Sequence, residues 1–219
     1  MNIINGNKIF SFFTETKKGD KELTSNEIKC TTGYNEKRLN DFVTGRFCAK
    51  TAIEKLGHSN IEVLIGLEGR PQWPFDLVGS ISHSESLTGA IIAYKSDYIS
   101  LGVDIEEIGN VTVDLWDFLF TKSEKDFLKG FNDPKKQIEQ STIIFSMKES
   151  FYKLQNPITN IFLDFLDVEI KLVSGVYHIN VICPFKKHEK LSTETEIFFK
   201  KYNNVIITFC SWANSSLVN

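Results

Sequence analysis

Residues 87–106 have the sequence LTGAIIAYKSDYISLGVDIE, and this stretch decides the fold. It contains two apolar runs, Leu87 to Tyr94 and Tyr98 to Ile105, which are joined by three polar residues. Apolar runs of this length that are rich in β-branched and aromatic residues and separated by a polar turn predict two consecutive β-strands. The second run ends at two acidic residues, Asp104 and Glu106, so the same stretch also carries a candidate site.

Helical spacing dominates on the N-terminal side of these strands. Within residues 35–56, apolar side chains recur every three or four positions and a glycine follows, which predicts one long amphipathic helix. A short strand is expected over residues 61–67, and the two prolines of residues 68–74 (EGRPQWP) predict a loop. Residues 79–84 (GSISHS) are small and polar, and we expect them to form a loop that leads into the next strand.

Helices return on the C-terminal side. Residues 121–124 (TKSE) have the capping-box pattern, which predicts a helix ending near Gly130. Asp133-Pro134 predicts the start of a second helix, because aspartate is a favoured N-cap and proline is tolerated in the first helical turn. This helix should end at about residue 155, since the proline at position 157 disfavours helical backbone before it.

The last third of the chain is predicted to be mostly β-structure. Two hairpins are expected, over residues 168–181 and residues 196–210. The sequence therefore predicts an α+β protein in which each half offers a helix followed by a sheet. We expect the halves to comprise residues 1–100 and 101–219 of one compact unit, although no direct sequence repeat relates them.

Composition limits the classes of function. The chain has 219 residues, of which 42% are hydrophobic, so it can bury a substantial core. A formal net charge of −3 argues against the broad basic surface of a nucleic-acid-binding protein. An anionic ligand would therefore be held by a few well-placed cations.

The cysteines and the N-terminus indicate the compartment. The four cysteines lie far apart in the sequence and include no Cys-x-x-Cys pair, so we expect reduced thiols and neither a zinc site nor a disulfide framework. Residues 1–13 do not resemble a secretory leader, and no apolar run of about 18 residues occurs. These patterns predict a cytoplasmic protein without a membrane-spanning segment.

Two acidic segments 45 residues apart form the first candidate site. Asp104 and Glu106 alternate along a strand, so they project from one face about 7 Å apart and could share a divalent cation. Glu149 and Lys153 lie one helical turn apart in residues 145–153 (FSMKESFYK) and could face the same ligand. Each pair alone also fits ordinary solvated charges or a surface ion pair. Their joint occurrence favours a metal site with a cation beside it, as phosphate esters require.

Cations that could hold a second anionic group lie in the N-terminal half. Arg38 and Arg46 are about 12 Å apart along the predicted helix, so both could border one groove. His83 follows Ser82 in a run of small residues whose backbone amides could approach an anion. The alternatives are arginine stems that cover apolar surface and a histidine with no role beyond its loop.

These motifs, taken in order, resemble those of the 4′-phosphopantetheinyl transferases, and of the enterobactin synthetase component D group in particular, with the surfactin-synthetase-activating enzymes as relatives. The resemblance covers roughly residues 38–155, and five blocks in the right order are far more specific than any single one. Two exchanges depart from the family pattern: Phe145 stands where many members have Trp, and Ser84 where close relatives often have Cys. The blocks are residues 44–49 (TGRFCA), 69–74 (GRPQWP), 79–84 (GSISHS), 101–106 (LGVDIE) and 145–153 (FSMKESFYK).

The resemblance implies a reaction and a site. Members move the phosphopantetheine arm of coenzyme A to a serine of an apo-carrier protein and release 3′,5′-ADP. The implied Mg²⁺ ligands are Asp104, Glu106 and Glu149, and the implied pyrophosphate contact is Lys153; Asp104, Glu149 and Lys153 would be catalytic. The remaining coenzyme A contacts implied by motif position are Arg38, Arg46 and His83 for the 3′-phosphate, and Arg70 and Pro71 beside the adenosine, where the Arg70 guanidinium could also reach a phosphate. Ser82 is a further implied coenzyme A contact.

The resemblance also implies an architecture and a partner. The family fold is a pseudo-twofold pair of α/β halves with coenzyme A in the cleft between them, and the chain length favours a monomer. The partner would be an acyl, peptidyl or aryl carrier protein. The apolar residues of segment 111–120 could receive a carrier helix, although core packing explains each of them equally well. Lysines that could contact an acidic carrier follow at positions 122, 125 and 129.

Two other functions suit the same residues. The protein could be a catalytically inactive scaffold that binds coenzyme A or a carrier protein. It could also be a metal-dependent phosphodiesterase, since paired carboxylates with a nearby lysine suit phosphodiester cleavage.

Overall fold

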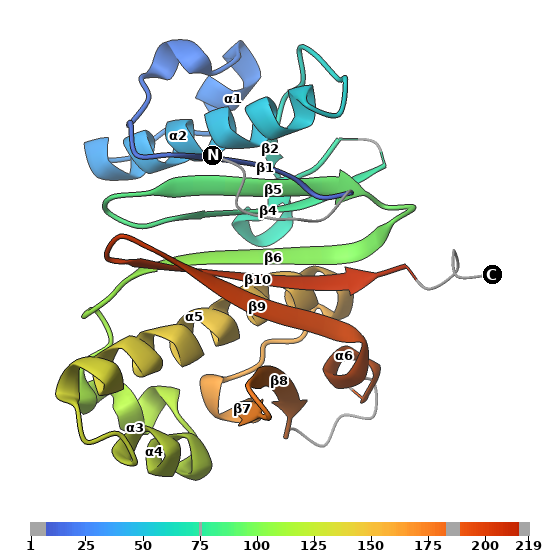
Figure 1. The fold of residues 1–219 in the computed structure, drawn as a ribbon. Coiled ribbons are helices and arrows are strands. Elements are labelled where there is room, and N and C mark those ends of the chain that lie inside the picture. The colour runs from blue at the N-terminus through green and yellow to red at the C-terminus, as the bar shows by residue number, and fades with distance from the viewer. Residues whose placement is uncertain (1–7, 75, 183–188, 215–219) are drawn as a thin grey trace. The chain divides into compact units, whose positions relative to one another are not determined.

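The computed structural model describes residues 8–74, 76–182 and 189–214 (Figure 1). The chain divides into two compact units between Leu101 and Gly102, and Asn214 is grouped with the first unit. The backbone N–H of Asn214 donates a hydrogen bond to the carbonyl oxygen of Asp97 at 2.9 Å. The residues used above to argue against a leader lie partly outside the described ranges, as does Cys183.

Unit 1 is a three-stranded antiparallel sheet in the order β1-β5-β4, with helix α2 packed against it. Small and aliphatic side chains of α2, among them Ala49, Ala52 and Ile53, form a core with Ala90 and Ile92 of the sheet. The elements of this unit are β1 (Phe10–Thr14), η1 (Asp20–Glu22), α1 (Ser25–Lys29), α2 (Glu36–Glu54), β2 (Leu64–Ile65), η2 (Leu67–Gly69), β3 (Pro71–Gln72), β4 (Leu77–His83) and β5 (Thr88–Tyr94).

The predicted long helix is confirmed as α2. Asn35 caps it, since its side chain accepts a hydrogen bond from the backbone N–H of Arg38 at 2.9 Å. Gly45, a poor helix former in mid-helix, sits where the helix approaches the sheet: a Cβ there would lie 2.9 Å from Cγ2 of Ile81. Close packing against β4 therefore explains this glycine.

Three expectations for unit 1 were wrong. Residues 79–84 are not a loop, because β4 extends to His83 and pairs with β5, with Ser82 opposite Gly89. The strand expected over residues 61–67 is only Leu64–Ile65, and the loop at 68–74 contains η2 and the short strand β3. The chain turns there because Glu68 and Gly69 both adopt positive φ, at 55° and 79°. Strand β1 was not predicted.

Unit 2 repeats the same plan. Its sheet has the order β6-β10-β9, and the long helix α5 packs against it. The core includes Met147, Phe151 and Leu154 of α5 with Ile206 and Cys210 of β10. The elements are β6 (Tyr98–Glu107), which carries the chain from unit 1 into unit 2, η3 (Val113–Leu115), α3 (Trp116–Leu119), α4 (Lys122–Lys129), α5 (Pro134–Thr159), η4 (Phe165–Asp167), β7 (Val168–Val173), β8 (Val176–Val181), α6 (Glu189–Glu194), β9 (Thr195–Tyr202) and β10 (Val205–Ala213).

Most local predictions for unit 2 are confirmed. The capping box of α4 forms between Thr121 and Glu124, Asp133 caps α5, and both hairpins are present as β7–β8 and β9–β10. The predicted end of α5 was wrong, because the helix continues through Pro157 to Thr159. It ends where Asn160 adopts the left-handed conformation, with φ at 53°.

The two units share one topology. Each has a first strand, then a long helix, then an antiparallel hairpin whose last strand pairs with the first: β1, α2, β4 and β5 in unit 1, and β6, α5, β9 and β10 in unit 2. The predicted α+β class and its pair of α/β halves are confirmed at the level of topology. None of the described helices combines the length and apolar character needed to cross a membrane.

Candidate functional site

The acidic site of unit 2 lies where strand β6 contacts helix α5. Asp104 of β6 is buried, and its Oδ1 accepts a hydrogen bond from Nζ of Lys153 at 2.7 Å. Its Oδ2 accepts one from Oγ of Ser146 at 2.8 Å, and Ser146 in turn contacts Thr208 of β10. The carboxylate is therefore held from both sides, while the side chain of Lys153 is 29% exposed.

A glycine makes this contact possible. A Cβ built on Gly102 would lie 1.9 Å from the carbonyl oxygen of Ser150, which belongs to the backbone of α5. Only glycine lets β6 approach the helix this closely, and Asp104 follows two residues later on the strand. The glycine of the sequence LGVDIE is thus part of the geometry that brings Asp104 to Lys153.

Two further carboxylates share the electrostatics of this site. Burial raises the pKa of Glu106 to about 7, helped by the negative charges of Asp104 and Glu149 and opposed by Lys153. Burial also raises the pKa of Glu149, with Lys153 lowering it and Asp104 raising it. The charges of Asp104, Glu106 and Glu149 therefore exceed what Lys153 neutralises.

The donor set fits a hard divalent cation. Mg²⁺ prefers carboxylate and other oxygen ligands, and a local excess of negative charge favours its binding. In the part of the chain that the structure describes, however, no three His, Cys, Asp or Glu side chains have the geometry of a finished metal site. Asp104 is engaged by Lys153, so a cation would have to compete with that ammonium for Asp104.

A cavity of about 270 Å³ adjoins Glu149. Most of its wall is apolar and comes from α5 and from the segment that follows it. Phe162, in that segment, is 76% exposed and lies at the cavity. The lining comprises Lys148, Glu149, Phe151, Tyr152, Phe162, Leu163, Asp164, Phe165 and Val168.

The cationic site of unit 1 is a second cavity, of about 380 Å³. It brings together four of the residues singled out from the sequence, namely Arg38, Arg46, Pro71 and His83. Ser82 and Arg70 do not line it: Ser82 is buried on β4, and Arg70 forms an ion pair with Glu68. The other lining residues are Tyr34, Asn35, Lys37, Asp41, Phe42, Gly45 and Ile81.

The two arginines of α2 differ in their availability. The guanidinium of Arg38 stacks 4.2 Å from the centre of the Tyr34 ring. Arg46 is buried, its Nε donates to the carbonyl oxygen of Val63 at 2.5 Å, and burial lowers its pKa to about 10. Arg46 thus holds the cavity wall with its guanidinium, whereas Arg38 remains near the opening.

An acidic side chain that the sequence did not single out organises this cavity. Asp41 lies 3.7 Å from Nδ1 of His83 and accepts a hydrogen bond from Nζ of Lys17 at 2.9 Å. The carboxylate therefore faces the imidazole and can orient it. Its position one helical turn after Arg38 was the available signal.

The apolar segment 111–120 is divided between core and surface. Val111, Trp116 and Phe120 are buried in the unit 2 core. Val113, Leu115 and Phe118, in contrast, are 62%, 38% and 71% exposed. These three side chains form the part of the segment that a partner could reach.

Two sequence profiles match the chain. The profile described as the 4′-phosphopantetheinyl transferase N-terminal domain matches residues 29–93, and that of the 4′-phosphopantetheinyl transferase superfamily matches residues 100–210. The chain belongs to the 4′-phosphopantetheinyl transferase superfamily. The resemblance found in the five motifs is therefore confirmed, and the two matches follow the two units of the fold.

Individual members of the superfamily show the degree of similarity. The 4′-phosphopantetheinyl transferase Svp of Streptomyces mobaraensis is 35% identical over 68% of this chain and 61% of its own length. PptT of Mycobacterium tuberculosis is 31% identical over 61% and 58%, and enterobactin synthase component D of Escherichia coli K12 is 27% identical over 80% and 77%. The chain thus spans about three fifths of the length of Svp and PptT.

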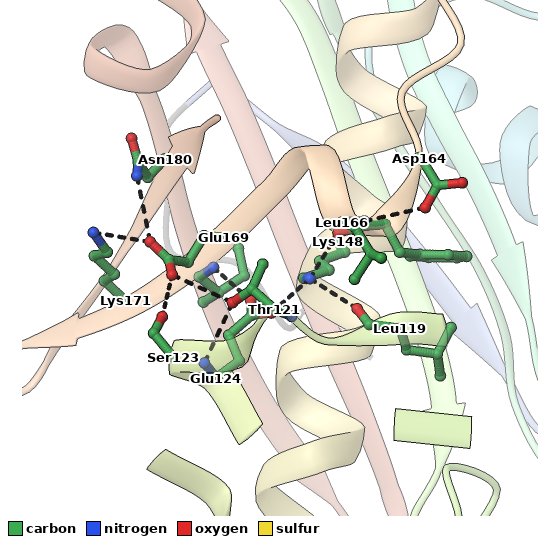
Figure 2. Close-up of polar contacts among 12 residues, drawn as sticks. Leu119, Thr121, Ser123, Glu124, Lys148, Asp164, Leu166, Glu169, Lys171 and Asn180 are labelled. Carbon is green, nitrogen blue, oxygen red and sulfur yellow. Dashed lines mark hydrogen bonds and ion pairs between the residues drawn. The ribbon is translucent and has the colours of Figure 1, made fainter. Parts of the chain in front are cut away.

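The superfamily motif FSMKESFYK contains one lysine whose role the sequence did not reveal. Lys148 directly precedes Glu149, yet it is turned into unit 2, where it forms an ion pair with Glu124. Glu124 was identified only as a helix cap. Both residues belong to the buried network that Figure 2 shows.

Proposed function

We propose that this protein transfers the 4′-phosphopantetheine arm of coenzyme A to a serine of an apo-carrier protein, in a Mg²⁺-dependent reaction that releases 3′,5′-ADP. Membership of the superfamily supports this reaction class. The observation that carries the assignment to this chain is the acidic site of unit 2, in which Lys153 forms an ion pair with Asp104 and also interacts with the charges of Glu106 and Glu149. A pyrophosphate needs both a cation bridge and an adjacent donor.

In this proposal the residues of unit 2 act on the pyrophosphate. Asp104, Glu106 and Glu149 hold Mg²⁺, which when bound neutralises the pyrophosphate charge. Lys153 donates to a pyrophosphate oxygen, for which its partial exposure is suitable. The carrier serine Oγ attacks the β-phosphorus, the bond to 3′,5′-ADP breaks, and the serine proton is accepted by the Glu149 carboxylate or by a water molecule beside it.

The cavity of unit 1 is our candidate site for the 3′-phosphate of coenzyme A. We assign Arg38 and His83 to this phosphate, because both line the cavity and both are exposed. Arg46 shapes the wall through its bond to Val63, and Pro71 borders the adenosine. Ser82 and Arg70 lie outside the lining, so we propose no direct contact for them.

The test measures 3′,5′-ADP release and intact mass gain on a panel of apo-carrier proteins. We expect Asp104→Ala and Glu149→Gln each to remove most Mg²⁺-dependent transfer, by at least about 100-fold. The matched control is Glu139→Gln on the same helix α5, which breaks only a surface ion pair with Lys201. Turnover near that of the wild type in either site variant would refute the assignment.

The same assay distinguishes the alternatives. An inactive scaffold would be stabilised against heat by coenzyme A, since binding to the native state raises its stability, but would release no 3′,5′-ADP. A phosphodiesterase would instead cleave a generic diester without a carrier protein. Transfer of the arm to a carrier with release of one equivalent of 3′,5′-ADP is expected of neither the inactive scaffold nor the phosphodiesterase.

We further propose that the carrier contacts the exposed apolar side chains of η3 and α3. Val113, Leu115 and Phe118 are 62%, 38% and 71% exposed, whereas the other large apolar side chains Val111, Trp116 and Phe120 of the segment are buried. Phe118→Ser should raise KM for the carrier and leave coenzyme A affinity unchanged. The described cysteines Cys30, Cys48 and Cys210 are free thiols, which agrees with a cytoplasmic location.

A further inference from the structure

Lys148 of α5 is the centre of a buried polar network in unit 2 (Figure 2). Its side chain is 2% exposed. Nζ donates hydrogen bonds to Oε2 of Glu124 at 2.7 Å and to the carbonyl oxygens of Leu119 and Phe165, each at 2.8 Å. A lysine ammonium has three protons to donate, so these three acceptors use its full capacity.

Glu124 is equally saturated. Its side chain is fully buried, and Oε2 also accepts a hydrogen bond from the backbone N–H of Thr121 at 2.8 Å. Oε1 accepts one from the backbone N–H of Ile170, in β7, at 2.7 Å. Each charge is thus compensated by the other and by hydrogen bonds with backbone groups, and the carboxylates of Glu169 and Asp164 also favour the charged form of Lys148.

The pair connects the segments around the cavity beside Glu149. Leu119 ends α3, the helix that exposes Phe118, and Phe165 belongs to the cavity wall. Lys148 itself lines the cavity and directly precedes Glu149 in α5. One buried ammonium therefore fixes both the wall of the cavity and the end of α3 relative to Glu149.

We infer that Lys148 and Glu124 are positioning residues, which hold the cavity wall and the end of α3 against Glu149 without contacting the ligand. This inference rests on the proposed function for its activity readout. It distinguishes two lysines of one motif: the side chain of Lys153 is 29% exposed, whereas that of Lys148 is 2% exposed and its ammonium already donates three hydrogen bonds.

The experiment compares Lys148→Met, Glu124→Gln and the double variant. Each single change leaves a buried group uncompensated, so we expect kcat to fall at least about tenfold and KM for the carrier to rise. The affinity for coenzyme A, measured by calorimetry, should stay within about twofold of the wild type, whereas Lys153→Met should weaken it by more than about tenfold. Glu124→Gln is nearly isosteric and keeps this measurement possible if Lys148→Met does not fold.

The double variant decides between positioning and ligand contact. With both substitutions in place no unpaired charge is left, so adding Glu124→Gln to Lys148→Met should recover thermal stability and at least about tenfold of the lost kcat. If Lys148 instead contacted a phosphate, Glu124→Gln alone would leave kcat unchanged and the double variant would recover nothing. Either of these results would overturn the inference.

A control and an independent readout complete the design. Lys201→Met breaks the exposed pair with Glu139 of the same helix, and it should change neither activity nor stability. The thermal unfolding midpoints of the two single variants and the double variant test the pair without an activity assay, because paired residues give changes in midpoint that do not add. If the wild type modified no carrier, the proposed function would fail. The unfolding midpoints would still test the pairing of Lys148 with Glu124. Changes in midpoint that simply add in the double variant would refute this pairing.

Discussion

Replacing Gly102 by alanine should disable the acidic site without changing any ionisable group. Gly102 lies on β6 where the strand meets α5, and the added Cβ would come within 1.9 Å of the carbonyl oxygen of Ser150 and 3.1 Å of the backbone nitrogen of Leu154. Both atoms belong to the backbone of a helix that is buried in this region, so no flexible side chain can give way.

The size of the effect follows from that distance. Ordinary contact between non-bonded heavy atoms is about 3.5 Å, so strand and helix must separate by roughly 1.5 Å. Overpacking of this kind costs about 1 to 3 kcal/mol, which lowers Tm by several degrees for a chain of this length. The 2.7 Å contact between Asp104 and Lys153 bridges the same two elements, and a displacement of about 1 Å at a reacting site can cost about 100-fold in rate.

Thermal unfolding and carrier modification would be measured on Gly102→Ala and on Gly19→Ala. A Cβ on Gly19 meets nothing within 4 Å, so that variant should behave as the wild type. The expected result is a folded, destabilised Gly102→Ala protein with kcat reduced about 100-fold. An unchanged midpoint together with transfer within twofold of the wild type would refute the close approach of β6 to α5.

Two predictions concern ionisation. Burial raises the pKa of Glu169, but hydrogen bonds, that of Lys171 first, outweigh it and hold the pKa at about 2, below its ordinary 4.5. This contribution to stability is present above pH 4.5 and is lost as the pH falls toward 2, so urea unfolding should show Glu169→Gln less stable than the wild type at pH 7 and equally stable near pH 2. Burial raises the pKa of Cys48 and of Cys210 to about 12. Iodoacetamide at pH 8 should therefore label Cys30 but neither of these two in the native protein, and peptide mass mapping that finds either one labelled would contradict their burial.

Local signals explain what could be predicted of the fold. The cap of α4 depends on Thr121 and Glu124, which lie three residues apart, and the β7–β8 turn depends on Ser174 and Gly175, whose φ angles are 52° and 82°. Such features need no knowledge of the rest of the chain. They were predicted correctly because a few neighbouring residues determine them.

Non-local packing explains the errors in the fold. The small polar residues before His83 favour a loop by themselves, yet they form β4, because Ser80 and Ser82 pair opposite Ile91 and Gly89 of β5. Tertiary pairing overrides local preference in this strand. The helix α5 also continues beyond Gln155 although a proline follows at position 157.

The candidate site shows the same division between local and tertiary information. Sequence spacing placed Glu149 and Lys153 on one face of a helix, which the structure allows. It did not reveal that Asp104 is the partner of Lys153, since 49 residues separate them and Gly102 is needed to bring their elements together. Strand β6 can approach α5 this closely because Gly102 has no side chain, and the spacing of charged residues in the sequence does not indicate such an approach.

The two lysines of α5 show why charge counting along a motif is not sufficient. Lys148 and Lys153 each have a carboxylate partner at 2.7 Å, but the side chain of Lys148 is 2% exposed and that of Lys153 is 29% exposed. Glu124 neutralises the charge of Lys148 within the network of Figure 2. Lys148 therefore does not neutralise the acidic site, although Glu149 of that site is the next residue. Among the described residues, Lys153 is the lysine of this motif that interacts with Asp104, Glu106 and Glu149, and a divalent cation would balance negative charge that remains at these carboxylates.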